Sequence, residues 1–285
     1  MTAAFRRQLG WELTKLWRRP RTYVGFAGAL VFQAIVFGLL QLAPVRERML
    51  RTIWRLYQQY GIDQVFSALG TAVEVTGQAM VCVGAIALAL VGSDLVAKEA
   101  EDGTLRMAFC RPVTRTSVFF QKLVVCLVYT AALSAFVALC ALLLGLVLEG
   151  PGPLVVLTVR ESLFGIHEFG PGVTRYLMAI PLIAAGFFTV ALLAFTLACF
   201  PIKPATAAIV AIIFLLADWA IQMHPTFAPV APYTLMTRMA TWRQVFNDVI
   251  PWLRIERNYS VLALVDVGLL AVAWSAFQRR RLTPR

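Results

Sequence analysis

The sequence predicts an all-α integral membrane protein with six membrane-spanning helices. Hydrophobic residues make up 60% of the chain and charged residues only 14%, whereas soluble proteins carry about 25% charged residues. Six stretches of mostly apolar residues reach the length of about 20 that a helix needs to cross the roughly 30 Å apolar core of a bilayer. Charged residues, glycine or proline bound each stretch, as expected at helix ends. These observations exclude an ordinary soluble protein.

The six stretches are expected to form a single transmembrane domain over residues 1–285. The predicted spans are residues 22–43, 71–96, 117–148, 176–200, 204–223 and 259–277. The chain has five cysteines without the paired spacing of a thiolate metal site or a disulfide framework. We therefore expect neither a metal centre nor disulfides to hold the fold together.

Residues 1–21, ahead of the first span, are predicted to form an amphipathic helix at the membrane interface. One side of this helix is apolar and carries Phe5, Leu9, Leu13 and Leu16. The alternative is a basic flank that only orients the first span.

Positive charge predicts the orientation of the spans. If the N-terminus is cytoplasmic, segments on the side of the termini hold 16 of the 26 Lys and Arg residues. Cytoplasmic segments carry such an excess. We therefore expect both termini on the cytoplasmic side of the inner (cytoplasmic) membrane, and read the net charge of +11 as an orientation signal rather than as affinity for nucleic acid.

Two segments on the opposite side are too apolar to be plain loops. Residues 45–61 alternate arginines with apolar residues at helical spacing, which predicts an interfacial helix on the outer leaflet. Residues 224–258 combine four prolines with Trp and Phe residues. We expect short re-entrant helices there, because irregular backbone at membrane depth has to be buried in protein.

The motifs of several enzyme classes are absent from the sequence. It contains no H-E-x-x-H, no G-x-S-x-G and no G-x-x-x-x-G-K-[ST]. We therefore expect no catalytic residues and no nucleotide site in this chain. Asp218 and Asp266 lie inside predicted spans, but the neighbouring residues do not match the Tyr-Asp and Gly-x-Gly-Asp patterns of aspartyl intramembrane proteases.

Acidic residues inside a membrane are costly and usually find a partner or face water. Asp218, Asp266 and Glu74 are therefore candidates for the polar lining of a translocation path, with Asp266 nearest to the middle of its span. The alternative is a hydrogen-bonded packing contact without a role in transport.

The most informative stretch is the loop at residues 97–116, between the second and third spans. An acidic cluster is followed by glycine and threonine, and Pro112 ends the helix that they predict within two turns. Thr114 or Thr116 is expected to cap the third span. The residues that define this pattern are Glu99, Glu101, Gly103, Thr104, Leu105, Arg106, Pro112, Arg115 and Lys122.

This pattern resembles the signature of type-2 ABC exporter (ABC-2 type) permeases, E-x-E-x-G-T-L followed by P-[VL]-[ST]-R and a lysine that opens the next span. The resemblance implies that the loop contains a coupling helix, which docks on a separate ATPase subunit and transmits its movement to the spans. Glu99, Glu101, Arg106, Arg115 and Lys122 would be its polar anchors. The carboxylates pair either with those bases within the loop or with basic residues of the partner; the sequence leaves both open.

The resemblance also implies the assembly. A permease with six spans forms half of a translocation pathway, so a second permease protomer, in a homodimer or a heterodimer, and two ABC ATPase subunits are expected partners. The ATPase subunits would bind ATP and Mg²⁺, and this chain would hold no cofactor. Membrane lipids and an accessory protein on the outer side complete the expected partners.

A different class of function remains open at the level of sequence. A stand-alone secondary transporter or channel, driven by an ion gradient, would use Asp218, Asp266 and Glu74 as proton or cation sites. That function leaves the pattern at residues 97–116 without a role.

Overall fold

A computed structural model describes residues 3–48, 67–105, 114–158, 163–223, 225–227 and 229–280. Six of its helices are long and apolar enough to cross a membrane. This confirms the predicted all-α membrane fold with six spans. The spanning helices are α2 (Pro20–Leu40), the continuous run from α4 to α6 (Ala68–Glu101), α8 (Arg115–Leu148), α9 (Phe169–Cys199), α10 (Pro204–Met223) and α12 (Trp252–Arg279).

Several helices begin earlier than the hydropathy of the sequence indicates. The fourth begins at Phe169 rather than at residue 176, and the sixth begins at Trp252 rather than at residue 259. In both cases the additional turns contain charged or turn-forming residues that interrupt the apolar run, and the helix extends beyond its apolar stretch. Hydropathy alone therefore marks the membrane crossing and not the end of the helix.

The second span is not a uniform α-helix. It consists of α4 (Ala68–Ala79), a π-helical segment η1 (Met80–Gly84), α5 (Ala85–Ser93), a second π-helical segment η2 (Asp94–Lys98) and the short α6 (Glu99–Glu101). A π-helical turn changes the face of the helix on which the following residues lie, and such turns are frequent at functional sites.

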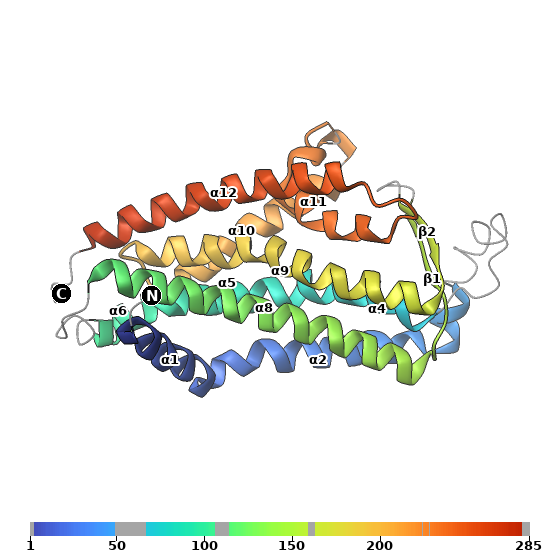
Figure 1. Cartoon of the computed structure of the whole chain (residues 1–285), viewed down its shortest axis with the longest axis horizontal. Coiled ribbons are helices and arrows are strands. Elements are labelled where there is room, and N and C mark those ends of the chain that lie inside the picture. The colour runs from blue at the N-terminus through green and yellow to red at the C-terminus, as the bar shows by residue number, and fades with distance from the viewer. Residues whose placement is uncertain are drawn as a thin grey trace.

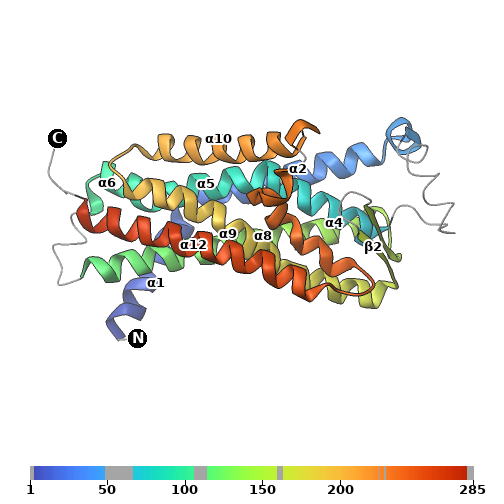
Figure 2. The ribbon, with the colours of Figure 1, turned by 90° about the horizontal axis from the view of Figure 1, so that it is seen from above.

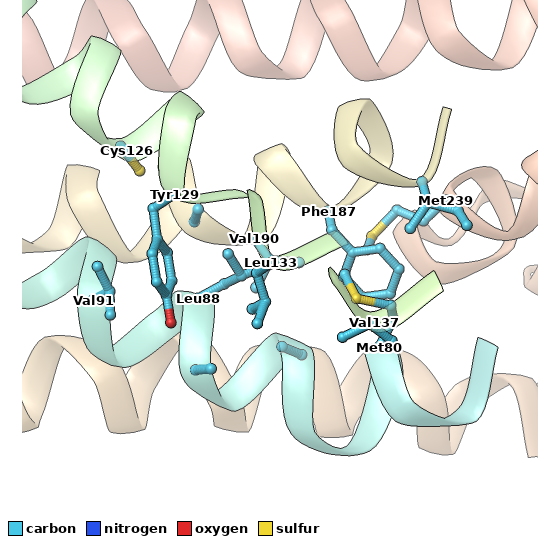
Figure 3. Close-up of a cluster of buried hydrophobic side chains, with 14 of the residues drawn as sticks. Met80, Leu88, Val91, Cys126, Tyr129, Leu133, Val137, Phe187, Val190 and Met239 are labelled. Atoms are coloured by element: carbon cyan, nitrogen blue, oxygen red, sulfur yellow. The ribbon is translucent and has the colours of Figure 1, made fainter. Parts of the chain in front are cut away.

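The spans run side by side along one long axis, and α9 lies at the centre (Figure 1, Figure 2). It packs against α5, α8, α10 and α12. Figure 3 shows the apolar core between these helices, to which the second span, α8, α9 and α11 all contribute. Its labelled members include Met80, Leu88, Leu133, Val137, Phe187, Val190 and Met239.

The two ends of the bundle differ in structure (Figure 1). At one end lie the N-terminal helix α1 (Ala3–Arg18), α6, the start of α8 and the end of α12, and we call this the terminal end. The other end carries an antiparallel hairpin of β1 (Leu154–Thr158) and β2 (Leu163–His167). We call this second end the hairpin end. The hairpin was not expected from the sequence.

The segment between α10 and α12 is built from short helices. They are the 3₁₀ helices η4 (Pro225–Phe227) and η5 (Ala231–Tyr233), α11 (Leu235–Met239) and the 3₁₀ helix η6 (Ala240–Phe246). Residues 49–61 of the interfacial helix predicted at 45–61 lie outside the described residues.

Candidate functional site

The terminal end brings together three elements that are distant in the sequence. Helix α1 lies across this end, obliquely to the spans, and packs against α2 and α8 (Figure 1, Figure 2). The second span ends here in α6, and α8 begins here after the loop. The predicted coupling residues therefore lie beside the N-terminal helix.

Glu99 is the centre of a buried ionic cluster. Its side chain is only 4% exposed, although it stands at the end of a span. One carboxylate oxygen is 2.5 Å from Lys122 Nζ, and the other is 2.5 Å from Lys15 Nζ and 2.9 Å from Arg19 Nη2. We refer to Glu99, Lys122, Lys15, Arg19 and Glu12 as the Glu99 cluster.

Lys122 is buried more deeply than any other base of the cluster, with 1% of its side chain exposed. Besides Glu99, its ammonium group lies 3.4 Å from a carboxylate oxygen of Glu12. A buried charge is tolerated only when its partners are close and well aligned. The first member of the signature, Glu99, and the last, Lys122, therefore depend on each other.

The structure answers one question that the sequence left open. Glu99 pairs with bases of its own chain, so its carboxylate is not presented to a partner protein. Two of those bases, Lys15 and Arg19, come from the N-terminal segment, which the sequence analysis treated separately from the loop.

Helix α1 contacts the Glu99 cluster through a polar stripe that was not predicted from the sequence. The positions 8, 12, 15 and 19 follow the helical repeat, and each contacts the bundle. Gln8 Oε1 accepts a hydrogen bond from Gln121 Nε2 at 2.7 Å, one turn away from the contact between Glu12 and Lys122. The predicted apolar side is used as well, since Leu16 is buried and Leu9 and Leu13 pack against the core.

The second span ends directly after Glu99. Gly103 has a φ of +73°, a left-handed conformation that favours glycine and commonly ends a helix. Thr104 Oγ1 then donates a hydrogen bond to the Glu99 carbonyl oxygen at 3.3 Å, and Leu105 is buried. Glycine and threonine thus turn the chain out of the span and into the loop.

The remaining acids of the loop face outward. Lys98 Nζ lies 3.5 Å from Glu101 and 3.2 Å from Asp102, and the two carboxylate side chains are nearly half exposed. The signature therefore contains one buried and one exposed glutamate. Arg106 and Pro112, two further residues of the signature, lie outside the described residues.

The far side of the loop is anchored to the last span. Thr114 caps α8, as predicted, by accepting a hydrogen bond from the Ser117 amide at 3.2 Å. Arg115 donates to the carbonyl oxygens of Gln278 at 2.7 Å and Arg280 at 3.3 Å. These carbonyls stand at the C-terminal end of α12, where helices have unpaired acceptors.

Of the three candidate path residues, Asp218 has a structural contact. Its carboxylate accepts hydrogen bonds from the backbone amides of Leu235 at 3.2 Å and Met236 at 2.7 Å. These amides open the short helix α11, so Asp218 on α10 caps the N-terminus of a neighbouring helix.

Asp266 and Glu74 have different surroundings. Asp266 Oδ1 and the Thr189 hydroxyl on the adjacent helix α9 are both buried, and the two side chains face each other without a well-formed hydrogen bond. Glu74 is exposed and lies 3.3 Å from Arg243 Nη2 on η6. Within the described ranges, no group of three His, Cys, Asp or Glu residues is arranged to hold a metal ion.

The comparison with known families agrees with the resemblance in the loop. A family model described as ABC-2 family transporter protein matches residues 9–218. The match includes most of α1, the second span, the loop and α8. A search of curated proteins found no match.

Proposed function

Because the chain belongs to the ABC-2 transporter family and is a membrane-spanning permease of an ABC transporter, we propose that it forms the translocation pathway of an ATP-driven exporter. In this proposal two permease protomers bind two ATPase subunits. The ATPase subunits bind and hydrolyse ATP with Mg²⁺, and this chain converts their movement into transport.

The observation that supports this proposal is the buried ion pair at the base of the loop. Glu99 lies at the start of the loop and Lys122 follows its end, and their 2.5 Å contact joins the second and third spans at that point. A loop that transmits the movement of an ATPase subunit to the spans has to be rigid where it meets them. A paired charge buried in protein resists separation, because each partner would be left uncompensated.

Glu101 and Asp102 are the acids available to bind a partner. Both are exposed beside the loop, and exposed carboxylates form charge-assisted hydrogen bonds with Arg or Lys residues of another protein. We therefore assign the buried Glu99 to stiffness and the exposed Glu101 to docking. This assignment separates two glutamates that stand two residues apart.

Orientation follows from the same proposal. The ATPase subunits hydrolyse cytoplasmic ATP, so the terminal end with its loop would face the cytoplasm, and the hairpin end would face the outside of the inner membrane. The excess of basic residues on the side of the termini supports this orientation.

Among the candidate path residues, Asp266 is favoured over Asp218. The carboxylate of Asp218 is occupied by two backbone amides, whereas Asp266 retains a buried oxygen without a partner among the described residues. We expect Asp266→Asn to abolish transport at normal expression. Unchanged transport would remove Asp266 from the pathway.

The test is purification of the full-length chain from its native membrane in mild detergent, with mass spectrometry of the proteins that co-elute. The proposal predicts an ATPase subunit with a phosphate-binding loop. Glu101→Lys should lose this subunit or uncouple its ATP hydrolysis from transport, while Glu256→Lys, a charge reversal at an exposed acid of α12 near the hairpin end, should not. Full ATPase stimulation in Glu101→Lys would contradict the docking role.

A further inference from the structure

Helix α1 carries a third stripe of side chains that neither the core nor the Glu99 cluster uses. Positions 7, 11, 14 and 18 lie on one side of the helix, opposite to the apolar side of Leu9, Leu13 and Leu16. The residues of this exposed stripe are Arg7, Trp11, Thr14 and Arg18.

All four side chains of the stripe are exposed, and Trp11 has 72% of its surface accessible. Neither Arg7 nor Arg18 forms an ion pair with another described residue. Lys15 of the same helix and Arg19, directly after its end, are instead bound to Glu99. The helix thus separates the bases that hold it to the bundle from the bases that face away.

The position of the stripe relative to the membrane follows from the next helix. The apolar span α2 begins at Pro20, two residues after Arg18. Its first turn exposes Tyr23 and Val24. Since the apolar core of the bilayer begins here, Arg18 and its neighbours lie at the depth of the lipid head groups, where aromatic residues and bases are enriched.

We propose that the exposed stripe of α1 binds anionic phospholipids of the adjacent leaflet. The arginines provide the charge complement of a phosphate-bearing anionic head group. Trp11, placed between them on the helix surface, provides an aromatic ring that sits at the interface between head groups and acyl chains. Lipid charge would then hold α1 from one side while the Glu99 cluster holds it from the other.

The alternative occupant of such a surface is a protein. Trp11 and the continuity of the stripe with the exposed first turn of the span α2 favour lipid, because that turn enters the bilayer. This inference concerns the partner of α1 alone and does not depend on ATPase docking.

The test uses native mass spectrometry of the full-length chain, extracted in an uncharged detergent and incubated with phosphatidylglycerol or phosphatidylcholine. We expect wild type to retain phosphatidylglycerol in preference. A basic residue near an anionic surface strengthens binding by about five-fold. Arg7→Gln/Arg18→Gln should therefore weaken phosphatidylglycerol retention on the order of 25-fold, and Arg7→Lys/Arg18→Lys should keep most of it.

The matched control is Arg254→Gln/Arg257→Gln, which removes two exposed arginines of α12 near the hairpin end. The control should retain most of the preference. Equal losses in the two pairs would mean that only the total charge of the protein matters, and would overturn the proposal. Full phosphatidylglycerol retention in Arg7→Gln/Arg18→Gln, with loss of a co-purifying protein, would assign the stripe to that protein instead.

Discussion

The two ends of the bundle are held together by different kinds of contact. At the terminal end, one buried carboxylate, Glu99, joins α1, the second span and α8 through ion pairs between side chains, beside the hydrogen bonds of Arg115 to carbonyl oxygens. At the hairpin end, side chains bind the backbone of residues 245–248. Arg175 donates to the carbonyl oxygens of Val245, Asn247 and Asp248, and His167 Nε2 lies 2.9 Å from the Phe246 carbonyl oxygen.

This difference determines how each end responds to change. Breaking a buried ion pair leaves a charge without compensation, so substitutions at the terminal end should lower the free energy of unfolding strongly. The carbonyl groups at the hairpin end can accept hydrogen bonds from water or from other donors instead. Losses of stability there should therefore be smaller and confined to that end. The terminal end, which is proposed to transmit movement from the ATPase, is thus the end whose contacts cost most to break.

The largest effect is expected from Glu99→Gln. Among the described residues, the substitution leaves the buried Lys122 with only the more distant Glu12 as counter-charge, and the free energy of unfolding should fall by about 3–5 kcal/mol. Thermal unfolding of the purified chain in detergent measures this loss. Glu101→Gln, at the exposed glutamate, is the matched control and should change stability by less than about 1 kcal/mol. Equal effects at the two positions would contradict the assignment of buried and exposed glutamates.

The double variant Glu99→Gln/Lys122→Met sharpens the same comparison. Replacing both members of a buried pair often restores stability that the single change loses. We expect the double variant to be more stable than Glu99→Gln in the same unfolding assay. If it is less stable, the loss in Glu99→Gln does not come from the stranded charge of Lys122.

An intermediate effect is expected from Arg175→Met at the hairpin end. The change removes charged hydrogen bonds to the carbonyl oxygens of Val245 and Asp248, each worth about 1.5–3 kcal/mol. Hydrogen exchange should rise in residues 240–248 and not at the terminal end. A rise spread over both ends would show that the two regions are not independent.

Gly165→Ala should have a similar or smaller effect. A Cβ atom at Gly165 would overlap the Phe246 carbonyl oxygen, so β2 and η6 would have to move apart, at about 1–3 kcal/mol. Gly170→Ala is the control, since a Cβ atom there meets nothing within 4 Å. Similar thermal unfolding of the two variants would show that β2 does not pack closely on η6.

The smallest effects on the free energy of unfolding are expected at Asp218 and Asp266, the two acids inside the spans. The two substitutions should differ in their effect on stability. Asp218→Asn weakens the cap of α11 and should cost about 0.5–2 kcal/mol. Asp266→Asn replaces a carboxylate that has a partnerless buried oxygen, so it should be neutral or stabilising. A larger loss in Asp266→Asn would show that its carboxylate has a structural partner.

Features that arise from composition and local pattern could be predicted from the sequence. Six apolar stretches predict the six spans, and Thr114, which caps α8, is one of the two threonines expected to do so. The polar stripe of α1 could have been found as well, because Gln8, Glu12, Lys15 and Arg19 follow the helical repeat. The prediction for residues 1–21 rests on the apolar side of the helix and assigns no contact to its polar side.

Features that depend on contacts with the backbone of segments far away in the sequence could not be predicted in the same way. The run Leu154–Thr158 is rich in Leu and Val and follows two prolines, which is a signal for a strand. The hairpin, however, packs against the Phe246 carbonyl oxygen through His167 and Gly165, and a carbonyl group carries no sequence signature. The burial of Glu99 also depends on α1 folding back onto the loop, which no local pattern indicates.

The central claim is that the Glu99–Lys122 pair makes the loop and two spans move together with the ATPase. The most direct test is hydrogen exchange of the purified permease–ATPase complex in nanodiscs, with and without ATP. In wild type we expect ATP to change exchange in η2 and in the part of α8 that packs against it. In Glu99→Gln/Lys122→Met the ATPase should still bind but this change should be lost, whereas an unaltered response to ATP would contradict the claim.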